Sequence, residues 1–260
     1  MPDCPAAVAR LTSDHTWTPY PVISTGTGLA GRAWVAGPYL VRYTAAARVV
    51  ADERARLDWL RPRHPSPEVV AVDGCWLVLA LPPGHPAHAP ELSSEPASVP
   101  LALGAGLRRL HQLPVGDCPF VRSWETIVAE IEAGIDGGRL DARCLPEPYR
   151  RYGPERLGEL VRASRPPPPP DPVVGHGSPG LSNLFVGTET WSGVIGVHRL
   201  GVADRHLDLA VIHRSIAEVL GPQALFGFYE GYGADPDLVR LDHYLLLDLL
   251  LTAIGASGAG

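Results

Sequence analysis

The sequence contains no lysine: all 22 of its basic residues are arginine, and 28 acidic residues outnumber them. The formal net charge is therefore −6. This negative balance argues against nucleic-acid binding, because nucleic-acid phosphates require a basic surface. We expect no nucleic-acid partner.

Cysteine is scarce as well. The four residues are scattered along the chain, as Cys4, Cys75, Cys118 and Cys144. They form no C-x-x-C pair, and no histidine cluster lies at metal-ligand spacing. This pattern predicts reduced thiols rather than disulfides or metal ligands, and no metal site.

Long apolar runs are missing too. The most apolar segment, Tyr244 to Ile254, has about half of the ~20 residues that a bilayer span needs, and it contains Asp248. The first ten residues lack the basic start and the apolar stretch of a signal peptide. These absences favour a cytoplasmic protein with no membrane partner.

The residues that are present suit a globular protein, with 45% hydrophobic and 19% charged residues in 260. Residues 1–44 are typical of short antiparallel strands, and the glycine-rich segment Thr25 to Val35 predicts a hairpin whose backbone N–H groups could face phosphates. A strand is predicted over Tyr39 to Tyr43 and an amphipathic helix over Ala45 to Leu60. The chain is long enough for one two-lobed domain or two small ones.

Asp73-Gly74 predicts a second hairpin, between strands at Val69–Val72 and Cys75–Leu79. The segment from Arg165 to Pro170 is a stiff polyproline spacer. Further helices are predicted over Leu101–Leu113, Trp124–Ala133, Pro154–Ala163, His206–Leu220 and Asp242–Leu251.

The stretch from Val173 to Ala210 carries the most specific pattern, VVGHGSPGLSNLFVGTETWSGVIGVHRLGVADRHLDLA. It resembles the catalytic core of the aminoglycoside phosphotransferases, in which a His-Gly-Asp-x-x-x-x-Asn loop precedes an Ile-Asp-x-Gly-Arg segment. His176, Gly177 and Asn183 fall in register, and residues 199–208 continue the family pattern. The string from Leu110 to Pro114 matches a second family segment.

This resemblance implies an α+β, two-lobed fold like that of the protein kinases. Residues 1–81 would form a small lobe with an antiparallel sheet and one helix. Residues 82–100 would form a hinge and a loop. Residues 101–260 would form a mainly helical large lobe that contains the core at 173–210.

Several positions depart from the family pattern. Ser178 stands where the resemblance implies the catalytic Asp, and Gly196 stands where it implies the magnesium-binding Asp. Arg42 replaces the ATP-binding lysine, and Leu249 replaces a drug-binding Glu. Losing the metal ligand and the base together predicts a protein that is not an ATP-dependent kinase and needs no cofactor.

The resemblance implies structural roles for three other residues. Glu53 would pair with Arg42, and Asp208 would brace the backbone of the catalytic loop. His176 would be a further brace, and a nucleophile pair with Ser178 is disfavoured because no orienting acid is evident.

The altered cleft suggests three functions. His198, Arg42 and Arg199 could form a repurposed catalytic site, in which His198 acts as an acid or base near neutral pH. We then expect an ATP-independent cyclase, or its partner subunit, in the formation of peptide thioether rings, with a peptide substrate and a partner biosynthetic enzyme. A non-catalytic pseudokinase scaffold and a weakly active aminoglycoside phosphotransferase are the alternatives.

Overall fold

A five-stranded antiparallel sheet forms the N-terminal part of the protein, in the order β1-β2-β3-β5-β4. The computed structural model describes residues 4–20, 32–94, 98–187 and 191–256. The predicted Thr25–Val35 hairpin therefore lies mostly outside the described residues. The five strands are β1 (Trp17–Pro19), β2 (Arg32–Ala36), β3 (Tyr39–Tyr43), β4 (Val69–Asp73) and β5 (Trp76–Ala80).

The two faces of this sheet pack against different neighbours. One face, with Leu40 and Leu77, joins the main hydrophobic core, which continues into the helical part. On the other face Trp34 and Trp76 stack and pack with Val8 of the short helix α1 (Ala6–Leu11). Both faces are therefore covered, as expected of strands with apolar side chains in consecutive positions.

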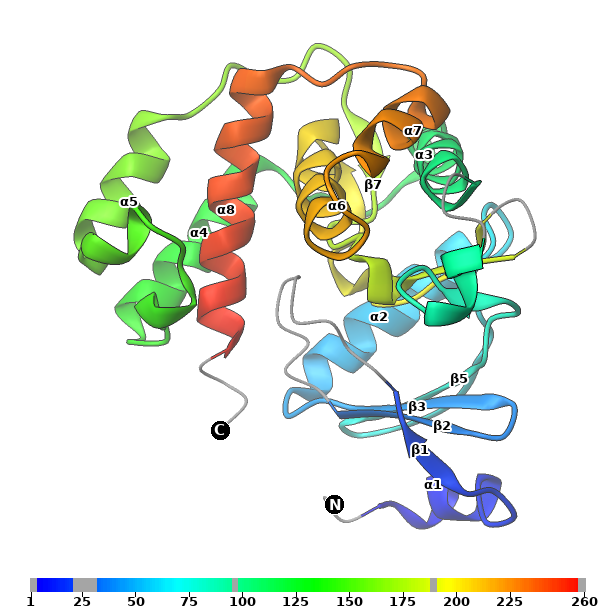
Figure 1. Cartoon of the computed structure of the whole chain (residues 1–260). Coiled ribbons are helices and arrows are strands. Elements are labelled where there is room, and N and C mark those ends of the chain that lie inside the picture. The colour runs from blue at the N-terminus through cyan, green and yellow to red at the C-terminus, as the bar shows by residue number, and fades with distance from the viewer. Residues whose placement is uncertain (1–3, 21–31, 95–97, 188–190, 257–260) are drawn as a thin grey trace.

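Helix α2 (Ala47–Leu60) lies between the sheet and the helical part of the molecule (Figure 1). Its buried residues are Val50, Glu53, Leu57 and Leu60, which recur at helical spacing and so form one face. A buried Glu on this apolar face requires a partner, because an unpaired carboxylate is costly to desolvate.

Six further helices lie in the described C-terminal residues, and α8 lies between the α4–α5 pair and α6 (Figure 1). Helix α3 crosses α7 so closely that an added Cβ at Gly104 would lie 2.0 Å from the Phe228 carbonyl oxygen. Only glycine permits that approach. The helices are α3 (Ser98–His111), α4 (Trp124–Asp136), α5 (Pro154–Ala163), α6 (Arg205–Val219), α7 (Ala224–Tyr232) and α8 (Leu238–Ala256).

Short strands connect these helices and hold the loops of the candidate site. Strand β7 (Val173–Gly175) pairs with β10 (Gly201–Ala203), and β6 (His85–Pro86), β8 (Leu184–Val186) and β9 (Trp191–Val194) form a three-stranded sheet. Two 3₁₀ turns lie in the intervening loops, η5 (Leu181–Asn183) and η6 (Val197–Arg199).

This mixed architecture confirms the α+β, two-lobed kinase-like fold expected from the sequence. The boundaries predicted for the small lobe (residues 1–81), the hinge and loop (82–100) and the large lobe (101–260) stay predictions. All four cysteines are free. Among the described residues, no helix is long and apolar enough to cross a bilayer.

Candidate functional site

The loop after β7 is held by one buried carboxylate. Asp208, on α6, accepts hydrogen bonds from the backbone N–H groups of His176 at 2.6 Å and Gly177 at 2.7 Å. It also lies 3.0 Å from Nε2 of His111, a contact that the sequence did not predict. Burial would raise the pKa of Asp208, but the hydrogen bond from His111 and the neighbouring charges and donors hold that pKa below its usual value.

Hydrogen bonds within the same loop surround Ser178, which is buried. The Ser178 carbonyl accepts from Nδ2 of Asn183 at 2.9 Å and from the backbone N–H of Gly180 at 2.9 Å. The backbone N–H of Ser178 faces Nδ1 of His176 at 3.3 Å. The loop therefore keeps a fixed shape with a hydroxyl, not a carboxylate, at position 178.

Glu53 joins the sheet to the segment before η6. Its Oε1 lies 2.5 Å from Nη1 of Arg42 on β3 and accepts the backbone N–H of Gly196 at 2.8 Å. Both side chains of the ion pair are almost fully buried. A charge-assisted hydrogen bond is strong where solvent is excluded. Glu53 therefore links Arg42 rigidly to Gly196.

Gly196 adopts a left-handed conformation, with φ +71° and ψ +27°. An added Cβ there would lie 2.9 Å from the amide group of Asn183. The Asn183 side chain thus occupies the space that a longer residue at position 196 would need.

These residues do not fit a magnesium ion. Position 196 offers no side chain, so the neutral amide oxygen of Asn183 is the one oxygen that the two family metal positions supply. Mg²⁺ prefers carboxylate oxygens, and no group of three His, Cys, Asp or Glu side chains suited to a metal occurs in the described part of the chain.

Replacing Gly196 by alanine is expected to lower the free energy of unfolding by about 2–3 kcal/mol, because strain at positive φ adds to the contact with Asn183. Gly74→Ala is the matched control, since Gly74 has φ +57° but nothing within 4 Å of an added Cβ. That control should lose only about 1 kcal/mol. Urea unfolding measures both, and equal losses would show that the Asn183 contact has no effect.

The three predicted catalytic residues lie near one another, but only two of them line the same cavity. His198 and Arg199 line a cavity between α2 and α4, whereas Arg42 is held by Glu53. Arg199 is ion-paired to Glu130 on α4. Burial lowers the pKa of His198 well below its usual value, and the charges of Arg199, Arg42 and Arg122 lower it further. His198 is therefore uncharged at pH 7, whereas the sequence had suggested a group that exchanges a proton near neutral pH.

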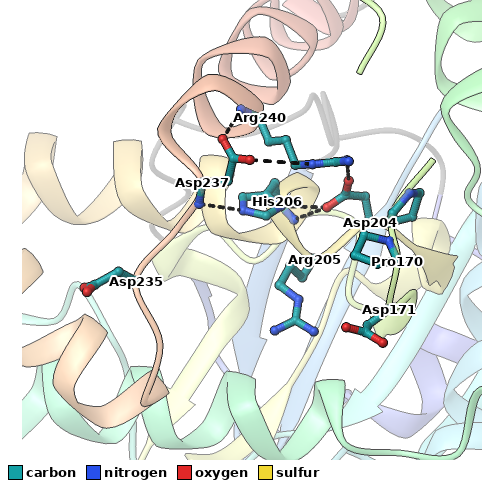
Figure 2. Close-up of a pocket in the computed structure, with 9 residues that line it drawn as sticks. Pro170, Asp171, Asp204, Arg205, His206, Asp235, Asp237 and Arg240 are labelled. Carbon is teal, nitrogen blue, oxygen red and sulfur yellow. Dashed lines mark hydrogen bonds and ion pairs between the residues drawn. The ribbon is translucent and has the colours of Figure 1, made fainter. Parts of the chain in front are cut away.

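A second cavity, of about 280 Å³, lies at the start of α6 (Figure 2). His206 accepts the backbone N–H of Asp237 at Nε2, which leaves its Nδ1–H to donate to Asp204 at 2.8 Å. Arg240 joins the same Asp204 at 2.6 Å, and Asp204 also caps α6 by accepting the His206 N–H (Figure 2). The bonds of this network are satisfied within it, which indicates a structural cap.

A braced loop after a short strand, together with a sheet arginine paired to a helix glutamate, defines the class of kinase-like phosphotransferases. Residues 31–244 match the model of the phosphotransferase enzyme family. The chain belongs to this family.

Individual relatives cover most of the chain. An aminoglycoside 3'-phosphotransferase of Streptomyces fradiae is 38% identical over 214 residues, 76% of this chain and 78% of the relative. A streptomycin 3''-kinase of Streptomyces griseus is 38% identical over 226 residues, 79% of this chain and 81% of the relative. The crystal structure of an aminoglycoside-3'-phosphotransferase of type VIII is 29% identical, with a TM-score of 0.80 over 94% of this chain and 97% of that one.

These relatives overturn the main functional expectation. The expected ATP-independent cyclase, or partner subunit for peptide ring formation, is wrong, because the similar proteins that span three quarters of the chain or more are aminoglycoside and streptomycin kinases. The departures at Ser178 and Gly196 suggested a new chemistry, but the pattern around them is that of antibiotic kinases. The expected weakly active phosphotransferase agrees better with this similarity.

Proposed function

We propose that the protein is an aminoglycoside phosphotransferase with slow turnover, which transfers the γ-phosphoryl group of ATP or GTP to a sugar hydroxyl. The observation that carries this proposal is the 38% identity to an aminoglycoside 3'-phosphotransferase over 76% of the chain. In the transfer, the bond from γ-phosphorus to the bridging oxygen breaks, a bond to the sugar oxygen forms, and the hydroxyl proton goes to solvent. A cytoplasmic location is part of the proposal, because ATP and GTP are supplied there.

The geometry is compatible with slow transfer. Phosphoryl transfer depends mainly on positioning and electrostatic stabilisation, and Asp208 and Glu53 fix the backbone at His176 and Gly196. A general base contributes roughly 10²–10⁴-fold, so Ser178 in place of a carboxylate lowers the rate, and the lost carboxylate at position 196 lowers it further, but neither change removes the effect of positioning. Retained positioning together with the missing carboxylates is expected to give slow turnover.

Adding the two missing carboxylates together is expected to raise the rate of transfer at least tenfold. The variant is Ser178→Asp/Gly196→Asp, and transfer is measured from ATP and GTP to streptomycin and to an aminoglycoside with a free 3'-hydroxyl. Aspartate tolerates the left-handed conformation of position 196 better than most residues, although the Asn183 side chain must move to admit it in both the variant and its control. Ser178→Asn/Gly196→Asn is the matched control, because it changes shape in the same way without adding charge.

The control should stay at the rate of the unmodified protein. No measurable transfer by the unmodified protein and no gain in the Asp variant would together exclude this proposal.

Binding of an aminoglycoside without transfer is the second candidate function. The specific observation that favours it is the donor set around Gly196 and Asn183, which does not fit magnesium. Calorimetry distinguishes the two candidates, because binding alone gives a saturable heat with the aminoglycoside and no nucleotide consumption.

A further inference from the structure

A basic cavity of about 610 Å³ lies between α2, the α3–α4 connection, α4 and η6. Its wall combines four arginines with only two carboxylates. The charged lining residues are Arg48, Arg56, Arg122, Arg199, Asp52 and Glu130. We call this space the arginine cavity.

Glu130 is shared by two arginines on the α4 side of the arginine cavity. Its Oε2 lies 2.7 Å from Nη2 of Arg122, and its Oε1 contacts Nη2 of Arg199. The side chains of Arg122 and Arg199 are only 8% and 13% exposed. One carboxylate therefore compensates two largely buried guanidinium groups.

Asp52 is shared in the same way on the α2 side. It lies 3.2 Å from Nη1 of Arg56 and 3.6 Å from Nε of Arg48. Arg56 also donates from Nε to the Leu200 carbonyl at 2.8 Å, which fixes its guanidinium group. Four arginines against two carboxylates leave two positive charges in the arginine cavity without a counter-charge.

Two buried guanidinium donors in this wall lack an acceptor among the residues that the structure describes. They are Nε of Arg122 and Nη1 of Arg199. Arg122 as a residue is only 7% exposed. The protein's own acceptors therefore neutralise these two guanidinium groups only in part, and their charge favours an anion in the adjacent cavity.

We propose that the arginine cavity binds a phosphate monoester or inorganic phosphate as a dianion, because two negative charges would match the two that the wall leaves uncompensated. The space also includes Thr44 and Thr126, and apolar side chains such as Val49, so an organic group attached to the phosphate can be accommodated. This site does not depend on the proposed function, since neither nucleotide nor aminoglycoside takes part.

The binding test titrates the full chain with inorganic phosphate and, separately, with glucose 6-phosphate. Isothermal titration calorimetry measures the affinity for each ligand. Saturable binding of either ligand supports the site. The ligand that binds more tightly shows whether the site prefers free phosphate or a phosphorylated sugar. Absence of saturable binding of both at millimolar concentration would overturn the proposal. Loss of aminoglycoside phosphorylation in a separate assay would not affect this result.

Two exposed arginines of α2 provide a matched pair of variants. Arg48 and Arg54 each form an i,i+4 ion pair with an aspartate, at 3.6 Å and 3.7 Å, but Arg48 lines the arginine cavity and Arg54 does not. Arg48→Ala is expected to weaken phosphate binding about threefold, whereas Arg54→Ala should leave it unchanged. Equal affinities of the two variants would contradict the assignment.

A third variant tests the charge balance directly. Glu130→Gln removes the carboxylate shared by Arg122 and Arg199 and should tighten phosphate binding about tenfold. The NMR titration of His198 gives an independent readout, because a bound dianion should raise its pKa. Weaker binding by a folded Glu130→Gln protein would show that the anion does not occupy this wall.

Discussion

Replacing Asp208 by asparagine is expected to lower the free energy of unfolding by about 3–5 kcal/mol, a large fraction of the stability of most domains. The buried carboxylate accepts from two backbone N–H groups and contacts His111. An asparagine has one acceptor oxygen, and its NH₂ group would face donors that the second carboxylate oxygen now accepts. Urea unfolding at pH 7 measures the loss.

The control for this variant is Asp58→Asn. Asp58 lies on α2 with its side chain 63% exposed and 3.7 Å from Arg54. Such exposed pairs contribute about 0–1 kcal/mol, so the control should remain close to the unmodified protein. A similar small loss in Asp208→Asn would mean that the loop of residues 176–183 is held by other contacts.

The order and type of the main elements could be predicted because their patterns are local. The predicted strand at Tyr39–Tyr43 has the limits of β3, and the helix expected at Ala45–Leu60 differs from α2 by two residues at its start. Both rest on spacing within one segment. Helix α7 has no such signal, since it contains two glycines and forms by packing on α3 through Gly104 and Gly231.

The site was predictable only where a motif fixed it. The motif placed Asp208 and Glu53, whose partners lie within the family pattern. It did not predict that Arg122, Glu130 and Arg199 meet, because 69 positions separate Glu130 from Arg199. It also did not predict that burial and three arginines keep His198 uncharged. Long-range charge balance is a property of the packed structure and leaves no local spacing in the sequence.

Several buried histidines predict a steep loss of stability in mild acid. Burial lowers the pKa of His176 to about 4, against the opposing charge of Asp208. Burial also lowers the pKa of His243 to about 4, and the pKa of His198 lies well below its usual value for the same first reason. His243 must be neutral at Nε2, because that atom accepts the indole N–H of Trp124 at 3.0 Å.

The lowered pKa values determine how the free energy of unfolding changes with pH. Below pH 6.5 the unfolded chain binds protons at these histidines while the folded chain does not, so protons favour unfolding. The stability is fully present above pH 6.5 and is lost as the pH falls towards 4. Near pH 5.5 each histidine whose pKa is lowered to about 4 should add about 1 kcal/mol per pH unit to the slope of the free energy of unfolding.

Replacing His243 by glutamine should remove about 1 kcal/mol per pH unit from that slope, since one titrating group is gone. The glutamine Oε1 can accept from Trp124 as the imidazole Nε2 does, so most of the packing is retained. Urea unfolding between pH 8 and pH 5 measures the slope for both proteins, and the difference at pH 8 gives the structural cost of the substitution by itself. Parallel pH profiles would show that His243 carries the same charge in the folded and unfolded chains, and a flat profile for the unmodified protein would extend that conclusion to His176 and His198.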